Sequence, residues 1–372
     1  MTVRESRCLQ SPATVNQFRD PKDPMPAKAV SAGQRLVAGC AVVVALLCGC
    51  SSNITDSAPR TIASGTPAVA PTPTNAPAGV VRQLAGVAYA AIVDPAGAGL
   101  VVLTGETDRD ADTVTVMGTA AQTGRTIALP QPATAIAGDG RGSAVLSTRG
   151  GYFSVDLMAG TVARVAVDGA SDVDFTAIAR RADGRLVLGS SDGTVFIVAE
   201  DADGSSAVEH RDKTFARVDS IVTQGNTSVV LDRGQTSVTA LNARGNIAQA
   251  LRAGEGATTM VADPAGRVLV TDPRGQELLV FSVDPLIMRQ RYPVSGAPYG
   301  LAGSQRLAWV SQTASNTVIG YELATGIPVE KVRYPTVQQP NILAYDDASD
   351  VLYVVSGSGA GVQVIEQAAG RA

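Results

Sequence analysis

The chain has 372 residues, of which 45% are hydrophobic, 17% are charged and 4% are aromatic, and its formal net charge is −4. This length can bury a real core in one large all-β domain or in two ordinary domains, and the acidic balance argues against a nucleic-acid-binding protein, which would present a basic face. The single histidine, His210, argues against most zinc sites and leaves one residue to serve any Ser-His-Asp or Cys-His mechanism.

Residues 1–49 have the features of a bacterial export signal. Lys28 and Arg35 form a basic region, and residues 36–47 form an apolar stretch that is short for a membrane span. Residues 1–24 are polar and carry charges of both signs, so Met25 is a plausible true start. We therefore predict a signal peptide over 1–49, and the alternative is an uncleaved N-terminal anchor helix.

The signal ends in Leu-Cys-Gly-Cys at residues 47–50, followed by two serines. This resembles the lipobox of bacterial lipoproteins, with Leu at −3, a small residue at −1 and Cys at +1, although Cys48 stands at −2 where Ala, Ser or Thr is usual. The resemblance implies cleavage between Gly49 and Cys50 and lipidation of Cys50. The chain's four cysteines all lie within its first 50 residues, so the mature protein would keep one cysteine, acylated, and no structural disulfide.

Residues 50–78 are rich in Pro, Ala, Thr and Ser and show no apolar periodicity. Such a composition predicts a disordered, partly polyproline linker between the lipidated Cys50 and the body of the protein. The prolines lie at Pro59, Pro67, Pro71, Pro73 and Pro77.

The body comprises residues 79–372, and from residue 87 on it repeats with a period of roughly 42 residues, as expected for propeller blades. Each unit reads as four short strands, and seven units predict an all-β, seven-bladed β-propeller with four-stranded blades. An eight-bladed ring, a six-bladed ring with extra hairpins and a β-solenoid are the alternatives. The units are predicted to start near Ala88, Ala133, Phe175, Arg217, Ala257, Pro298 and Pro340.

The seventh unit is incomplete, because little sequence follows its third strand at 362–366. Residues 80–85 precede the first unit and have no place within it. We expect this N-terminal segment to supply the missing outer strand of the last blade, which closes the ring and removes an exposed sheet edge.

The body has similar turns and strands at 94–97, 112–116, 183–187, 192–195, 263–272 and 315–318. These segments resemble the turns and strands of YVTN-repeat propellers. Together with the lipobox, they make the whole chain similar to actinobacterial propeller lipoproteins, and this resemblance implies the fold and the cell-envelope location. The YVTN group includes surface-layer proteins, DNA-binding periplasmic proteins and lactonases, so the resemblance implies no particular chemistry.

An acidic run, Glu106, Asp108, Asp110 and Asp112, is the strongest local cluster of ionisable residues. Alternating carboxylates can ligate Ca²⁺, but the calcium loop of an EF-hand would also need Gly at 113 and Glu at 119, where this chain has threonine. The alternative is a solvated turn.

A calcium ion held on the inner strands would support catalysis. Lactonases of the gluconolactonase type hold such an ion with Glu, Asn and Asp ligands. Asp94, Asn226, Asp263 and Asn341 have suitable side chains, although their places in the repeat also explain them as turn formers. His210 is expected on an exposed outer strand or the turn after it, away from such a site.

Aromatic residues are few. Tyr89 and Tyr299 are candidates for a ligand-recognition platform at the mouth of the tunnel, and the alternative for both, as for Trp309, is core packing.

The sequence therefore predicts a membrane-anchored, extracytoplasmic lipoprotein of the cell envelope that serves as a binding or assembly scaffold. Its expected partners are the membrane, through the lipid on Cys50, and a protein or envelope component; no nucleic acid and no cofactor are expected, and no catalytic constellation is evident. The alternative is a calcium-dependent, lactonase-like hydrolase with a site over the tunnel. Recognition is expected on the turns between second and third strands, because loops on a rigid frame commonly bind ligands; these turns lie near 104–113, 147–151, 190–193, 232–236, 272–277, 312–317 and 356–361.

Overall fold

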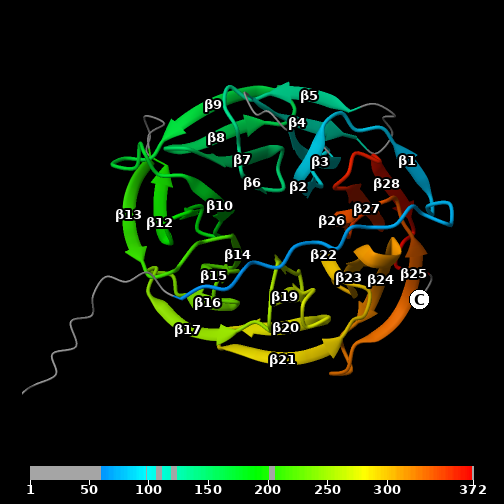
Figure 1. Cartoon of the computed structure of the whole chain (residues 1–372). Helices are drawn as coiled ribbons and strands as arrows, with labels where there is room; N and C mark the ends of the chain where they lie inside the picture. Colours follow the sequence, from blue (N-terminus) through cyan, green and yellow to red (C-terminus); the bar gives the residue numbers. More distant parts are fainter. Residues whose placement is uncertain (1–59, 98, 106–110, 119–123, 201–205, 371–372) are drawn as a thin grey trace, which may run out of the picture. The chain divides into compact units, whose positions relative to one another are not determined.

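The computed structural model describes residues 60–97, 99–105, 111–118, 124–200 and 206–370, which belong to one compact unit. In these residues, seven antiparallel sheets of four strands stand in a ring around a central axis (Figure 1). The predicted seven-bladed β-propeller is therefore confirmed. No helix in this part of the chain has the length and apolar character that crossing a bilayer requires.

The first three blades follow one another in the sequence, each running from its innermost to its outermost strand. Blade 1 contains β2 (Val87–Asp94), β3 (Gly99–Gly105), β4 (Asp112–Met117) and β5 (Arg125–Ala128). Blade 2 contains β6 (Ala135–Gly138), β7 (Ser143–Thr148), β8 (Gly151–Asp156) and β9 (Thr161–Ala166). Blade 3 contains β10 (Phe175–Arg180), β11 (Leu186–Ser190), β12 (Thr194–Glu200) and β13 (Ser206–Lys213).

The remaining blades repeat this order, except that the last is completed from the N-terminal side. Blade 4 contains β14 (Ser220–Gln224), β15 (Thr227–Asp232), β16 (Ser237–Leu241) and β17 (Ile247–Arg252). Blade 5 contains β18 (Thr259–Ala262), β19 (Arg267–Asp272), β20 (Glu277–Val283) and β21 (Leu286–Pro293). Blade 6 contains β22 (Pro298–Gly303), β23 (Leu307–Gln312), the 3₁₀ turn η1 (Thr313–Ser315), β24 (Thr317–Glu322) and β25 (Val329–Pro335). Blade 7 contains β26 (Pro340–Asp346), β27 (Val351–Ser356), β28 (Val362–Glu366) and β1 (Val80–Arg82).

The predicted unit starts lie within three residues of the observed first strands. Phe175, Pro298 and Pro340 coincide with the first residues of their strands, and the largest difference is that between Arg217 and Ser220. The ring also closes as predicted, because β1 pairs antiparallel with β28 and sets Val80 opposite Val364. The pairing covers the edge of β28 that would otherwise be open.

The core lies between blades rather than at the centre of the ring. Each of the seven clusters of buried apolar residues draws its members from two neighbouring blades. The middle strands of the blades are buried on both faces, which explains their continuous apolar sequences. Trp309 on β23 shows the packing: it is 0% exposed, and its ring lies 5.4 Å from that of Tyr345 in the next blade.

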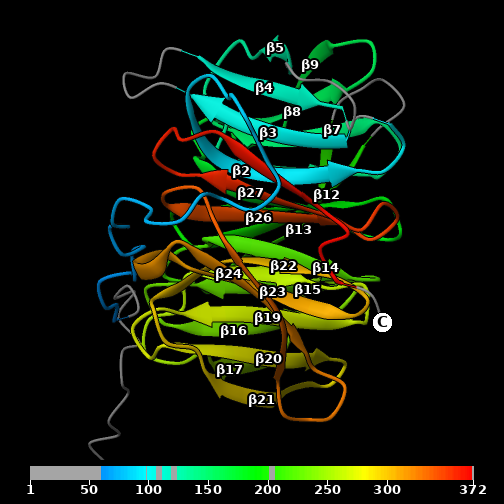
Figure 2. The ribbon, with the colours of Figure 1, turned by 90° about the vertical axis from the view of Figure 1, so that its right-hand side faces the viewer.

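The ring has two distinct faces because antiparallel strands alternate in direction (Figure 2). The turns between second and third strands share one face with the connections that lead into each first strand; we call this the loop face. The remaining turns form the opposite face.

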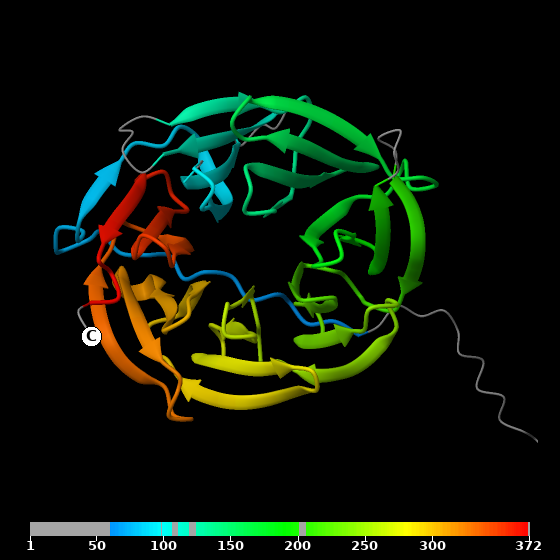
Figure 3. The same ribbon diagram turned by 180° about the vertical axis from the view of Figure 1, so that it is seen from behind.

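Residues 60–78 lie along the loop face without forming a helix or strand, and we call them the strap. Figures 1 and 3 show the strap, in blue, crossing the ring from blade 4 toward β1. The sequence predicts these residues as part of a disordered linker. The structure instead gives them main-chain hydrogen bonds to the loop face, for example from Ile62 N–H to Gly234 O (2.8 Å). Residues 50–59 lie outside the described residues.

Candidate functional site

A cavity of about 530 Å³ lies on the axis, lined by the first strands of all seven blades. Most of its wall is small or aliphatic, because the first strands are rich in Ala, Ile, Val and Thr. Figure 1 shows these strands nearest the centre of the ring. Its polar lining includes Tyr89, Thr134, Thr176, Asp219, Ser220, Arg233, Thr258, Thr259, Tyr299 and Asn341.

Two threonine hydroxyls at the cavity wall join neighbouring blades. Thr134 Oγ1 donates to the carbonyl of Phe175 (2.5 Å), and Thr176 Oγ1 donates to that of Val218 (2.5 Å). These bonds tie one first strand to the start of the next blade, so the hydroxyls stiffen the rim of the cavity.

The charge at the cavity is concentrated beside blade 4. Asp219 is the one carboxylate among the described lining residues, and it accepts hydrogen bonds from the main-chain N–H of Arg233 (2.8 Å) and from Arg217 Nε (3.1 Å). Ligation of Ca²⁺ requires several oxygen ligands around one point. In the described lining, no second carboxylate meets Asp219.

The four residues considered as inner-strand calcium ligands separate between the two faces. Asp94 ends β2 at the opposite face, where Asn226 and Asp263 lie in turns, whereas Asn341 lines the cavity. The first two accept main-chain hydrogen bonds from a neighbouring blade, Asp94 from Gly142 N (3.0 Å) and Asn226 from Asp183 N (2.9 Å). Their positions therefore favour the alternative of turn formers, with an added role in joining blades.

Of the acidic run, the structure describes Asp112; Glu106, Asp108 and Asp110 lie outside the described residues, as do Gly49 and Cys50. Asp112 is buried, and its Oδ2 accepts a hydrogen bond from Ala133 N (2.8 Å). This bond ties the connection between blades 1 and 2. Among the described residues no group of three or more His, Cys, Asp or Glu side chains could hold a metal ion, and the calcium site stays a prediction.

Other blades place a polar residue at a similar point, a feature not predicted from the sequence. Asp232 accepts from Ala216 N (2.8 Å), Gln312 donates to Ser295 O (2.7 Å) and Ser356 donates to Gln338 O (2.7 Å). Each of these residues ends its second strand, so a polar residue after an apolar run was the available signal.

Both candidate aromatic residues of the platform line the cavity. Tyr89 lies on β2 and Tyr299 on β22, and the main-chain carbonyl of Tyr299 accepts a hydrogen bond from Thr271 Oγ1 (2.8 Å). The structure thus brings both residues to the axis, and their role in ligand recognition stays a prediction. Trp309 is part of the core.

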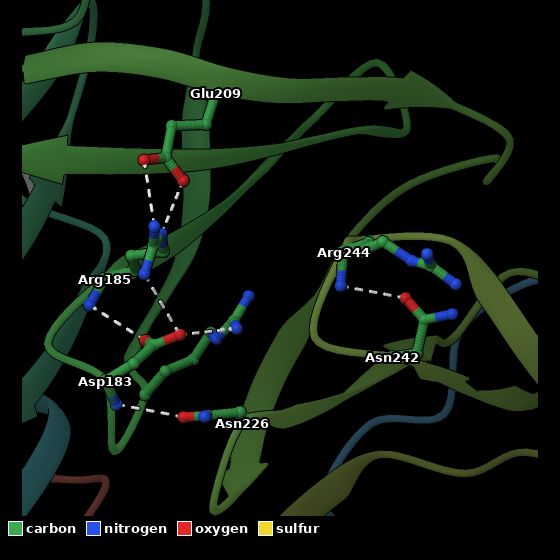
Figure 4. A network of polar contacts seen from close by, with 7 residues as sticks. Asp183, Arg185, Glu209, Asn226, Asn242 and Arg244 are labelled. Atoms are coloured by element: carbon green, nitrogen blue, oxygen red, sulfur yellow. Dashed lines mark hydrogen bonds and ion pairs between the residues drawn. The ribbon is translucent and has the colours of Figure 1, made fainter.

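The opposite face carries a polar network between blades 3 and 4 (Figure 4). Arg185 donates to both carboxylate oxygens of Glu209, at 2.5 and 3.2 Å, and this hydrogen bonding raises the pKa of the Arg185 guanidinium. His210 lies next to Glu209 on the outer strand β13, and both line a small pocket with Arg181 and Asp183. Most of these bonds lie within one blade, and the bond from Asp183 N–H to Asn226 Oδ1 joins blade 3 to blade 4.

No protein-family model and no curated protein sequence matches this chain. Solved structures do resemble it: hydrazine synthase of Kuenenia stuttgartiensis (13% identity, TM-score 0.62), a streptogramin B lyase (9%, 0.60) and the WD40 repeats of RRP9 (12%, 0.64). The similarity covers 77%, 77% and 78% of this chain and 97%, 96% and 99% of those chains, respectively. At these identities the likeness shows the fold alone.

Proposed function

We propose that this chain is a lipid-anchored scaffold of the bacterial cell envelope that binds a protein partner on its loop face. The observation that carries the binding role is the lining of the cavity: Asp219, the one carboxylate among its described residues, is paired with Arg217, and the surrounding wall is small and aliphatic. A calcium-dependent hydrolase would instead need several oxygen ligands converging on the axis.

The similar structures are consistent with this proposal without selecting it. Their names describe enzymes as well as the WD40 repeats of RRP9, and one fold commonly hosts both kinds of protein. The choice therefore rests on the chemistry of the loop face and the cavity.

The anchor would also orient the propeller. Arg60, the first described residue of the strap, is ten residues beyond Cys50. Ten residues span at most about 35 Å when fully extended. A lipid on Cys50 would therefore hold the loop face near the membrane, where a partner of the same membrane could reach it.

The anchor is tested by Cys50→Ser, with Cys48→Ser as the matched control, in a bacterium that processes lipoproteins. The Cys50 variant should lose the mass of the lipid and move to the soluble fraction, whereas the Cys48 variant should stay with the membrane. Continued membrane association of Cys50→Ser would contradict the anchor.

The binding role is tested by crosslinking in isolated envelopes, comparing Arg274→Ala on the loop face with Arg185→Ala on the opposite face. A partner whose capture falls with the first variant alone supports the proposal. A stabilisation of the chain by calcium, together with capture that neither variant changes, would favour the hydrolase.

A further inference from the structure

The strap is held by its main chain. Among its side chains only that of Ala70 is buried, while the neighbouring Val69 is 92% exposed. Others, such as Ala68 and Ala78, are half-buried. A segment with a single buried side chain is recognised mainly by its backbone shape and its peptide groups. The loop face therefore contains a surface that binds an extended polypeptide with little demand on its sequence.

Gln339 forms the centre of this surface. Its Nε2 donates to Ala68 O (2.8 Å), and its Oε1 accepts from Ala70 N–H (2.9 Å). One side-chain amide thus makes the pair of bonds that a neighbouring strand would make. The pair fixes the direction and the register of the strap at Ala70, where the site has room for a small side chain.

Asn316 extends the contact by one residue and supports Gln339. Its Nδ2 donates to Pro71 O (2.7 Å), while its Oδ1 accepts from the main-chain N–H of Gln339 (3.1 Å). Both residues adopt left-handed backbone conformations, with φ of +47° for Asn316 and +57° for Gln339. Non-glycine residues rarely hold this conformation, and such positions cluster at ligand clamps.

The two ends of the strap are held in the same way. At one end, Arg274 in the turn between β19 and β20 of blade 5 donates from its Nη2 to Ala63 O (2.8 Å). Near blade 7, Gln363 Nε2 donates to Ala78 O (2.7 Å), and Ala78 N–H donates to Pro335 O (3.1 Å). The binding surface therefore extends along the whole length of the strap.

This pattern of hydrogen bonds suits proline. Five strap carbonyls accept bonds from side chains of the loop face, whereas three strap N–H groups, at Ile62, Ala70 and Ala78, donate to it. Proline lacks an N–H but keeps its carbonyl, so it loses no bond here. It also holds the chain extended before binding, which lowers the entropy cost of docking.

We propose that the strap is the tethered ligand of a peptide-binding site on the loop face, and that the partner supplies an extended, proline-containing segment that replaces it. The inference rests on the proposed function, because it names the chemical class of the partner. A tethered segment competes at an effective concentration on the order of millimolar. With one buried side chain, the strap is held weakly enough for a longer or better-fitting segment to displace it.

The test uses a fluorescent peptide with the sequence of residues 60–78 and the full chain carrying a strap that cannot dock. Ala70→Glu places a charge in the one buried side-chain position and should release the strap. Val69→Glu, at the exposed neighbouring residue, is the matched control. By fluorescence anisotropy, the Ala70→Glu chain should bind the peptide at least tenfold more tightly than the wild-type and Val69→Glu chains, whose sites are occupied.

Two further reagents locate the binding. Adding Gln339→Ala to the Ala70→Glu chain should abolish it, and a peptide in which the four prolines become alanine should bind several-fold more weakly. Equal peptide binding by the Ala70→Glu and Val69→Glu chains would overturn the inference. It would also be overturned if hydrogen exchange showed that the strap of the Ala70→Glu chain is released and this chain still bound no peptide. Dimers of the wild-type chain that exchange straps would assign the site to a second copy and overturn the partner class.

The assay contains no membrane, so it separates this inference from the proposed function. If the peptide binds but Cys50→Ser stays with the membrane, the lipid anchor is contradicted and the peptide-binding site is still supported. If no peptide binds but a partner is still captured through the loop face, the scaffold function is supported and an extended, proline-containing segment is excluded as the ligand.

Discussion

The turns after the second strands of blades 3 and 6 make the same connection with different chemistry. In blade 3 the hydroxyl of Ser190 bonds within the turn, since its Oγ donates to Asp192 (2.6 Å) and accepts from Thr194 N–H (3.0 Å). In blade 6 the side chain of Asn316 instead reaches the strap and the connection before β26. The comparison teaches that the polar side chains of one repeated turn can either stabilise the turn itself or form part of a binding surface.

The same division extends to the other blades. The residue before the third strand has a positive φ in each described turn, and it is glycine in blades 2, 3 and 7. In blades 4, 5 and 6 it is Thr236, Gln276 and Asn316, with φ between 47° and 52°. The strap binds at turns of these three blades, so the non-glycine residues stand where the loop face has a chain to bind.

Exchanging the turn residues of blades 3 and 6 should change the stability of the protein most when the change is made in blade 3. Gly193 has φ of +83°, and a Cβ there would lie 1.8 Å from Phe215 O. Gly193→Asn places the blade 6 residue in this turn, and we expect it to lower the free energy of unfolding by about 3 kcal/mol through overpacking. Denaturant unfolding measures this loss.

The matched control for this exchange is Gly184→Asn, at φ of +86°, where a Cβ would have no other atom within 4 Å. Asparagine tolerates the left-handed region, so this variant should lose less than about 1 kcal/mol. An equal loss in both variants would show that the backbone conformation, and not the contact with Phe215, sets the cost.

The reverse exchange, Asn316→Gly, should act locally. Glycine accepts φ of +47° but removes the bonds to Pro71 and Gln339. We expect hydrogen exchange in residues 60–78 to accelerate about 5- to 30-fold, while global stability changes little. Ser315→Gly, which removes a hydroxyl that bonds within the turn, is the control. Unchanged exchange in the strap would contradict the role of Asn316 as a clamp.

The propeller could be predicted from sequence because its signals are local and repeated. Seven apolar second and third strands with turn residues at a common spacing fix the number of blades, and the orphan segment at 80–85 predicts the closing strand. The polar residues that end the second strands, such as Asp232, can be seen in the sequence. Their hydrogen bonds to the connection between blades, such as the bond from Ala216 N–H to Asp232, cannot be predicted from it.

The strap could not be predicted in this way. Residues 60–78 have no apolar periodicity, and their partners Gln339 and Asn316 lie more than 240 residues away in the sequence. A proline-rich segment is also expected to stay free, because it buries too little apolar surface to dock. Here hydrogen bonds from side-chain amides replace that burial, and no sequence period marks them.

The smallest expected difference between the two turns is their response to acid. Burial raises the pKa of Asp192, but hydrogen bonds from Ser190 and Thr194 and the nearby Lys213 outweigh it and lower the pKa to about 2. A lowered carboxyl pKa stabilises the folded state above the ordinary value near 3.8, and this contribution disappears as the pH falls through about 2. Because the Asp192 side chain is half exposed, the contribution should be about 0.5–1 kcal/mol.

The free energy of unfolding should therefore differ between the wild-type chain and Asp192→Asn at pH 5, and the difference should shrink as the pH falls below 3.8 and through about 2. Asn316→Gly provides the contrast, because the blade 6 clamp consists of neutral amides and its effect on strap exchange should not depend on pH over this range. A constant difference for Asp192→Asn would mean that the hydrogen bonds, and not the charge, hold the blade 3 turn. The two turns would then differ in what they bind but not in how they are held.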